Sequence, residues 1–118
     1  MNRVAIVMLA DTETPEAMGR VVNGLMAASE FHEAGDEVRI IFDGAAVKWP
    51  GELAQPQHRY HDLYERLRPR VAGVCQYCAR AYGAAEQLEA IGAPMAAAYQ
   101  GHPSFRELVN KGYQVITF

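Results

Sequence analysis

The chain has 118 residues and a formal net charge of −3, and half of its residues are hydrophobic while about a fifth are charged. These values indicate one globular domain spanning residues 1–118. They exclude a disordered chain and a domain too small to bury its own core. No basic stretch alternates with aromatic residues, so nucleic acid is not an expected partner.

The first predicted element is a strand at Val4–Leu9, because this run is continuously apolar and rich in β-branched residues. An acidic stretch follows, with no A-x-A-like cleavage site, so we interpret the run as a strand rather than a signal peptide. No other apolar run approaches the length of a transmembrane helix. We therefore expect a cytoplasmic protein with no membrane partner, whose cysteines start out reduced.

A long helix is predicted next. Thr14 and Pro15 are typical of a helix start, and apolar residues then recur at helical spacing as far as Gly35, a typical helix stop. Gly19 and Gly24 lie inside this helix, where each costs about 1 kcal/mol relative to alanine. Close packing against a neighbouring element is the candidate reason for them.

Strands and helices alternate along the rest of the chain, and this alternation predicts parallel βαβ units with helices on both faces of a sheet. The remaining predicted strands are Val38–Phe42, Val71–Val74, Pro94–Ala98 and Val115–Phe118. The remaining predicted helices are Tyr60–Leu67, Cys78–Ile91 and Ser104–Lys111. Ala45 to Gln57 reads as a loop with at most a short helix, and Trp49 in this Pro- and Gly-rich loop is one reason to expect self-association.

The two cysteines of the chain, Cys75 and Cys78, lie where a predicted strand passes into a predicted helix. The carboxyl ends of parallel strands are where ligand sites lie in open α/β sheets. A helix start also favours a thiolate, and its dipole lowers a thiol pKa by about one unit or less. Arg80 adds positive charge nearby. The pattern predicts a reactive site in which Cys75 is the lower-pKa nucleophile and Cys78 its exchange partner.

Three other interpretations of the cysteine pair stay open. Both thiols can be ordinary buried residues. A C-x-x-C near βαβ units is also typical of thioredoxin-like redox proteins. His58 and His61 form an H-x-x-H that, with Cys75 and Cys78, offers four zinc ligands. We expect the histidines to lie on the solvent side of their helix instead, and so expect no metal ion.

Further candidate residues follow the other strands and are expected at the same edge of the sheet as Cys75. They are Asp11 and Thr12 after the first strand, Asp43 after the second, and Tyr99 and His102 after the fourth. The alternative role for Asp43 is that of a cap or turn residue. Histidine exchanges protons near neutral pH, which would suit His102 to assist a thiol. The loop after the first strand lacks glycine and is acidic, so no phosphate-bearing cofactor is expected.

The stretches "VAIVMLADTE", "CQYCARAYG" and "GHPSFRELVNKGYQVITF" resemble the DsrE/DsrF-like group, which includes the YchN-like and Tus sulfur-relay proteins. The most specific feature of the resemblance is a cysteine at the end of a middle strand with a glycine eight positions later, as in Cys75 and Gly83. The resemblance implies a three-layer α/β/α sandwich with a five-stranded parallel sheet, flavodoxin-like in appearance. It also implies a homo-oligomer, commonly a trimer or hexamer.

By the same resemblance, Cys75 would receive sulfane sulfur from a donor protein, hold it as a persulfide and pass it to an acceptor protein. Our functional hypothesis is therefore a small sulfur carrier or sulfurtransferase. One alternative is a non-catalytic oligomeric module that binds a small ligand or a partner protein. Another is a C-x-x-C thiol–disulfide redox protein.

Overall fold

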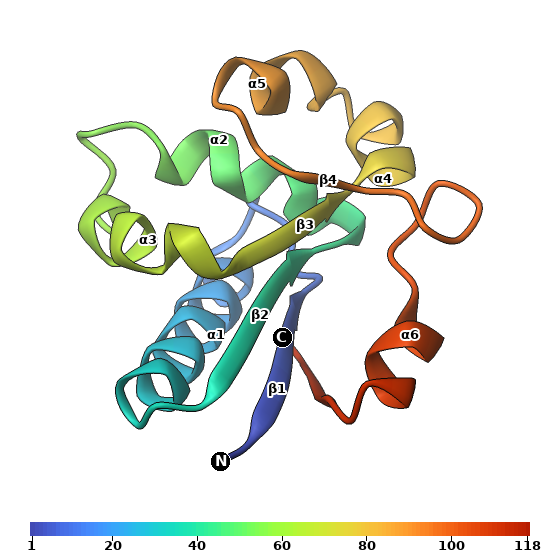
Figure 1. The fold of residues 1–118 in the computed structure, drawn as a ribbon. Helices are drawn as coiled ribbons and strands as arrows, with labels where there is room; N and C mark the ends of the chain where they lie inside the picture. The colour runs from blue at the N-terminus through green and yellow to red at the C-terminus, as the bar shows by residue number, and fades with distance from the viewer.

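Five parallel strands form a single sheet at the centre of the computed structural model, which describes all residues 1–118 (Figure 1). The strands are β1 (Arg3–Met8), β2 (Glu37–Phe42), β3 (Val71–Cys75), β4 (Met95–Ala96) and β5 (Gln114–Thr117). The α-helices are α1 (Pro15–Glu33), α2 (Trp49–Leu53), α3 (His61–Leu67), α4 (Gln76–Ala81), α5 (Ala85–Ala90) and α6 (Phe105–Asn110). Two 3₁₀ helices complete the chain, η1 (Gly44–Lys48) and η2 (Arg68–Arg70).

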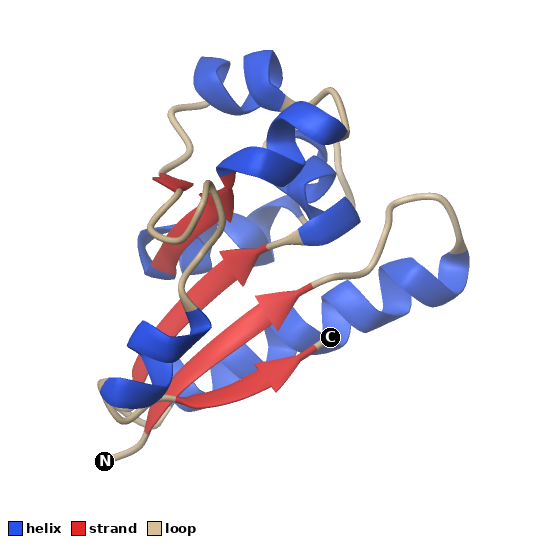
Figure 2. Ribbon diagram, turned by 90° about the vertical axis from the view of Figure 1, so that its right-hand side faces the viewer, coloured by secondary structure: helices blue, strands red, loops and turns tan.

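The strand order is β4-β3-β2-β1-β5, with every neighbouring pair parallel. From β1 to β4 the chain steps in one direction across the sheet, and it then returns through α6 to place β5 on the other side of β1. Because all five strands point the same way, their carboxyl ends meet at one edge (Figure 2). The predicted α/β fold with a five-stranded parallel sheet is confirmed.

The two faces of the sheet are covered very unequally. The larger core cluster holds 22 buried residues and includes side chains from α1 to α5 as well as from the strands. The smaller cluster holds five buried residues on the opposite face, where Leu108 of α6 packs over β1 and β2. Helices therefore flank the sheet on both sides, but the third layer of the sandwich is α6 alone.

The sequence signals for α1 are confirmed in detail. The Thr14 side-chain oxygen accepts a hydrogen bond from the Ala17 N–H at 3.1 Å, so Thr14 caps the helix. Gly24 has a packing reason, since a Cβ there would lie 2.5 Å from Sδ of Met8 in the sheet. Gly19 has none, because nothing lies within 4 Å of the equivalent position.

Two predicted segments differ from the structure. Residues 45–53 are helical, in η1 and α2, and only residues 54–57 of the predicted loop lie outside helices. Trp49 is buried at 2% exposure, and its Nε1–H donates to the carbonyl oxygens of Ala10 and Asp11. Trp49 is therefore a core residue and offers no surface for self-association. The helix predicted at Cys78–Ile91 is broken into α4 and α5 at Gly83, whose φ of +69° lies in the left-handed region that ends helices.

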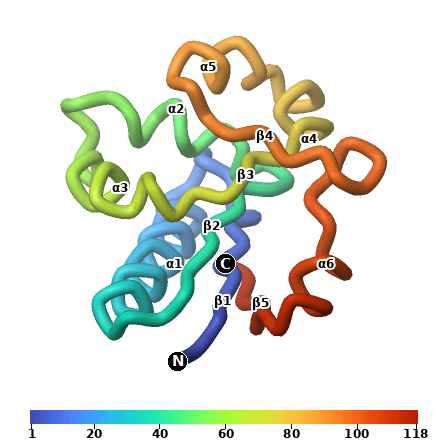
Figure 3. The backbone as a smooth tube through the Cα atoms, viewed as in Figure 1, coloured from blue at the N-terminus to red at the C-terminus, as the bar shows by residue number.

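The fourth strand is shorter than predicted, since only Met95 and Ala96 pair with β3. Beyond β4 the chain passes the start of α4, makes a tight excursion and then descends to α6 (Figure 3). In this excursion Tyr99 and His102 exchange backbone hydrogen bonds at 2.9 and 2.8 Å. The Tyr77 N–H donates to the Gly101 carbonyl at 2.9 Å and so attaches the excursion to α4.

None of the helices combines the length and the apolar character that crossing a membrane requires.

Candidate functional site

Four side chains with chemically active groups gather at the carboxyl edge of the sheet. Asp43 follows β2, Cys75 ends β3, Cys78 lies in the first turn of α4, and His102 lies in the excursion after β4. One carboxylate oxygen, two sulfurs and one ring nitrogen from this group all lie within 4.8 Å of one another. The parallel strands explain the grouping, because they bring residues that follow different strands to the same edge.

Cys75 is the innermost member of the group and is 0% exposed. It is the N-cap residue of α4, and its Sγ accepts a hydrogen bond from the Cys78 N–H at 3.4 Å. Nδ1 of His102 lies 3.4 Å from the same sulfur, and the Gly101 carbonyl oxygen lies 3.8 Å from it. The sulfur is thus enclosed between a helix start and the excursion after β4.

Burial governs the protonation of Cys75. It raises the pKa of this thiol to about 12, because a thiolate loses the solvation of water there. The hydrogen bond from the Cys78 N–H lowers the pKa, but by less, and the negative charge of Asp43 raises it further. The prediction that the helix start leaves Cys75 with a low pKa is therefore wrong for this closed arrangement, because desolvation outweighs the helix start.

Cys78 and Asp43 form the second pair of the group. Cys78 is half-buried, and its thiol donates to Oδ1 of Asp43 at 3.5 Å. The same carboxylate oxygen accepts the Gly44 N–H at 2.8 Å and caps η1. Asp43 is only 9% exposed. Its buried carboxylate therefore both caps η1 through the Gly44 N–H and contacts the Cys78 thiol.

Tyr77 is a member of the site that the sequence did not single out. Its ring lies against the imidazole of His102, with 4.7 Å between the ring centroids and 32° between the planes. This contact and the Tyr77 N–H bond to Gly101 hold His102 over Cys75. The only signal for Tyr77 was its place between the two cysteines of the C-x-x-C.

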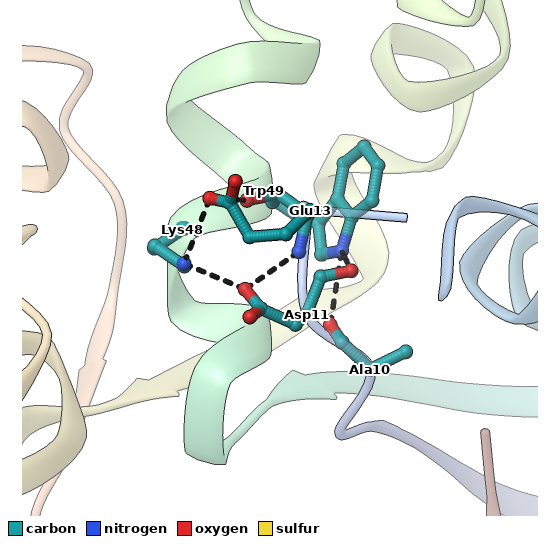
Figure 4. A network of polar contacts seen from close by, with 6 residues as sticks. Ala10, Asp11, Glu13, Lys48 and Trp49 are labelled. Carbon is teal, nitrogen blue, oxygen red and sulfur yellow. Dashed lines mark hydrogen bonds and ion pairs between the residues drawn. The ribbon is translucent and has the colours of Figure 1, made fainter. Parts of the chain in front are cut away.

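Asp11 and Thr12 lie outside the four-residue group and serve a different network (Figure 4). Oδ1 of Asp11 lies 2.6 Å from Nζ of Lys48 and accepts the Thr12 N–H at 2.7 Å. Nζ of Lys48 also lies 3.4 Å from a carboxylate oxygen of Glu13. This network joins the segment after β1 to η1, and no pattern in the sequence points to Lys48 as a member of it.

Arg80 and Tyr99 also lie outside the group, and each lines a different cavity. Arg80 is exposed and lines a cavity of about 490 Å³ with Tyr77 and Gly101. Tyr99 lines another cavity, about 690 Å³, which lies against α6. This cavity is not the candidate reactive site, because no cysteine or histidine lines it.

The histidine pair does not join the cysteines. His58 and His61 are both partly exposed, and His58 precedes α3 rather than lying on it. Nδ1 of His58 accepts the Tyr60 N–H at 3.0 Å, and Nδ1 of His61 lies 2.8 Å from the Leu53 carbonyl oxygen. These hydrogen bonds occupy one ring nitrogen of each histidine, and neither imidazole belongs to the cluster that contains the two cysteines.

Comparisons with known proteins agree with this architecture. The chain is 29% identical over 96 residues to an uncharacterized protein of Methanocaldococcus jannaschii, which covers 81% of this chain and 78% of that protein. The fold is similar to that of a conserved protein of unknown function from Bacteroides thetaiotaomicron, with a TM-score of 0.62 and 21% identity. That match covers 97% of this chain and 94% of the other. Residues 5–118 match the DsrE/DsrF-like family, and the chain therefore belongs to that family.

Proposed function

We propose that this protein carries sulfane sulfur as a persulfide on Cys75. The observation that carries the proposal is the position of Cys75 Sγ, which lies at the carboxyl edge of the sheet between the Cys78 N–H and Nδ1 of His102. A donor N–H and a proton-accepting imidazole are the two neighbours that a sulfur nucleophile uses. Membership of the DsrE/DsrF-like family supports the same reaction.

The reaction conserves electrons overall. The Cys75 thiol passes its proton to His102, and the resulting thiolate attacks the outer sulfur of a persulfide on a donor protein. A new S–S bond forms at Cys75 while the donor's S–S bond breaks, and the donor leaves as a thiolate that takes up a proton. An acceptor thiolate then attacks the outer sulfur of the Cys75 persulfide in the same way, which returns Cys75 to the thiol.

The burial of Cys75 sets a condition on this reaction. Because its sulfur is 0% exposed, a donor reaches it only when the Tyr99–His102 excursion moves away from α4. Opening also restores water to the sulfur and removes the main cause of its raised pKa. The closed arrangement then shields a persulfide from water and from small reductants, which is useful in a carrier.

Cys78 opens a competing path. If its thiolate attacked the inner sulfur of a Cys75 persulfide, a Cys75–Cys78 disulfide would form and hydrosulfide would leave. In that step the two cysteines are oxidised and the outer sulfur is reduced to sulfide. The Cys78 thiol points to Oδ1 of Asp43 at 3.5 Å, and this contact directs its sulfur towards the carboxylate, which favours retention of the persulfide.

The test is intact-mass spectrometry of the reduced, metal-free protein before and after exposure to a persulfide donor. A gain of one sulfur atom that disappears in Cys75→Ser and persists in Cys78→Ser supports the proposal. A gain that is lost only in Cys78→Ser assigns the carrier to the other thiol and contradicts the proposal. A loss of two hydrogens in the unaltered chain, together with no added sulfur in Cys78→Ser, contradicts the proposal and favours a thiol–disulfide redox protein instead.

A further inference from the structure

We infer that Asp43, Cys75, Cys78 and His102 form a binding site for one thiophilic divalent cation of the zinc class. The four residues supply two thiolates, one imidazole nitrogen and one carboxylate oxygen, all within 4.8 Å of one another. This set differs from the H-x-x-H and C-x-x-C combination that the sequence offered. The inference goes beyond the proposed function and does not depend on it.

The distances match a tetrahedral site. Zinc binds cysteine sulfur at about 2.3 Å and histidine nitrogen or carboxylate oxygen at about 2.0–2.2 Å, so a sulfur–nitrogen or sulfur–oxygen edge of the tetrahedron measures about 3.5 Å. The observed edges are 3.4 Å between Cys75 Sγ and His102 Nδ1, and 3.5 Å between Cys78 Sγ and Asp43 Oδ1. Two of the six edges therefore match, and the other four are no longer than 4.8 Å, so the side chains would close around an ion by about 1 Å.

The donor set selects the class of ion. Two thiolates with one imidazole are typical ligands of zinc, whereas calcium and magnesium require a shell made of oxygen. Both cysteines are free thiols, so neither sulfur is already committed to a disulfide. Binding would release the two thiol protons, which makes the affinity fall as the pH is lowered.

The surroundings of the four residues are those of a supported metal site. The Cys78 N–H donates to Cys75 Sγ, and the Gly44 N–H donates to Asp43 Oδ1. Hydrogen bonds of this kind to ligand atoms orient them and tune their basicity. The ring of Tyr77 against His102 limits the rotation of the imidazole. Cys75 and Asp43 are buried, which keeps competing water from most of the site.

A bound cation would also control the proposed sulfur reaction, and this consequence rests on the proposed function. A thiolate that coordinates zinc shares electron density with the metal and is a weaker nucleophile, and the ion would occupy the space beside Cys75 Sγ that a donor sulfur must enter. Metal binding and persulfide loading at Cys75 should therefore exclude each other. In this way the site would hold the protein inactive as a carrier while the cation is bound.

The experiment titrates the reduced, metal-free, full-length protein with Co²⁺ and follows its visible absorption. We expect one equivalent to bind, with thiolate-to-cobalt charge-transfer bands and the intense bands of tetrahedral cobalt, and we expect Zn²⁺ to displace it. Cys78→Ser and His102→Ala should each weaken Co²⁺ binding at least about a hundredfold, since loss of an outer hydrogen-bond partner alone costs 10–100-fold. The double variant His58→Ala/His61→Ala is the matched control and should bind as the unaltered chain does.

Circular dichroism of each variant checks that the fold is retained, and both substituted side chains are partly exposed, so folding should not depend on them. Absence of charge-transfer bands overturns the inference, as does binding that His102→Ala leaves unchanged or that the histidine double variant removes. Persulfide loading is then measured with and without one equivalent of Zn²⁺. If zinc leaves the extent of loading unchanged, the mutual exclusion is overturned. If the protein binds zinc but never loads sulfur, the metal site is retained and the carrier function is rejected.

Discussion

Nδ1 of His102 lies 3.4 Å from Sγ of Cys75, although the two residues are 27 positions apart in the chain. The contact exists because β3 and β4 are paired in parallel, so that the residues beyond their ends meet at one edge of the sheet. It places a proton acceptor beside a sulfur that is closed off from solvent.

If His102 accepts the proton of Cys75, His102→Ala should slow persulfide loading by at least about tenfold, since general bases contribute about 10²–10⁴-fold. The loading rate is measured by intact mass at several pH values, and the pH dependence of the unaltered chain should flatten in the variant. His58→Ala is the control, because His58 bonds only to its local backbone. Equal rates and equal pH profiles for His102→Ala and the unaltered chain would reject this role.

The two thiols should be alkylated in the order opposite to that predicted from the helix start. Near neutral pH, iodoacetamide should modify the half-exposed Cys78 first, because Cys75 is buried and its thiol pKa is raised to about 12. Modification of Cys75 should accelerate only in strongly alkaline solution. Peptide mapping by mass spectrometry gives the order, and Cys78→Ser isolates the slow site. Faster labelling of Cys75 would mean that its sulfur is open in solution.

Self-association should depend on α6. Phe105 and Val109 are exposed apolar residues one helical turn apart on the only helix that covers its face of the sheet. We expect an oligomer, a trimer or hexamer of the 13.0 kDa chain, that Val109→Asp dissociates by placing a charge in the interface. Light scattering measures the mass. Met26→Asp is the control, because it places the same charge at an exposed apolar residue of α1. A monomeric unaltered chain contradicts the expectation.

The two glycines inside α1 should respond in opposite ways to alanine. Gly19→Ala should stabilise the protein by up to about 1 kcal/mol, because no atom lies near the added methyl and alanine is the better helix former. Gly24→Ala should destabilise it by about 1–3 kcal/mol, since the methyl would lie 2.5 Å from Sδ of Met8. Urea unfolding measures both values. A stabilising Gly24→Ala would show that Met8 moves aside without cost.

The ion pair of Asp11 and Lys48 should make a contribution to stability that disappears in acid. The hydrogen bond from Lys48 holds the pKa of Asp11 below its ordinary value of 3.8. The folded state therefore favours the charged carboxylate. Its contribution is fully present above pH about 4 and is lost as the pH falls through the lowered pKa. Asp11→Asn should thus be less stable than the unaltered chain at neutral pH, and the difference in melting temperature should shrink below pH 4. A difference independent of pH would contradict the assignment.

The positions of the strands could be predicted from the sequence because each strand is a short apolar run with turn residues beside it. The break between α4 and α5 could not, since Ala81 to Leu88 keeps a helical pattern through Gly83. Gly83 adopts a positive φ and lets the chain reverse, so that both short helices pack on the same face. The glycine eight positions after Cys75 thus has a structural role in this chain.

The sequence predicts at which edge of the sheet the candidate site lies, but it does not predict the burial of the side chains there. The parallel topology alone groups the residues that follow β2, β3 and β4. It is therefore enough to predict that Asp43 and His102 lie near Cys75. Burial of Cys75 depends on the Tyr99–His102 excursion folding back over α4, and no local pattern in the sequence encodes that contact. Because the pKa of Cys75 depends on this burial, the sequence predicts a lowered pKa, whereas the structure gives a raised one.

The short pairing of β4 has a consequence for local stability. Only two residues of β4 pair with β3, and a single backbone hydrogen bond from Tyr77 attaches the excursion to α4. Segments with so few bonds open at a small fraction of the free energy needed to unfold the whole domain. Amide hydrogens in residues 97–102 should therefore exchange with solvent far sooner than those of β1, which has partners on both sides. The cover of Cys75 can open while the rest of the sheet stays folded.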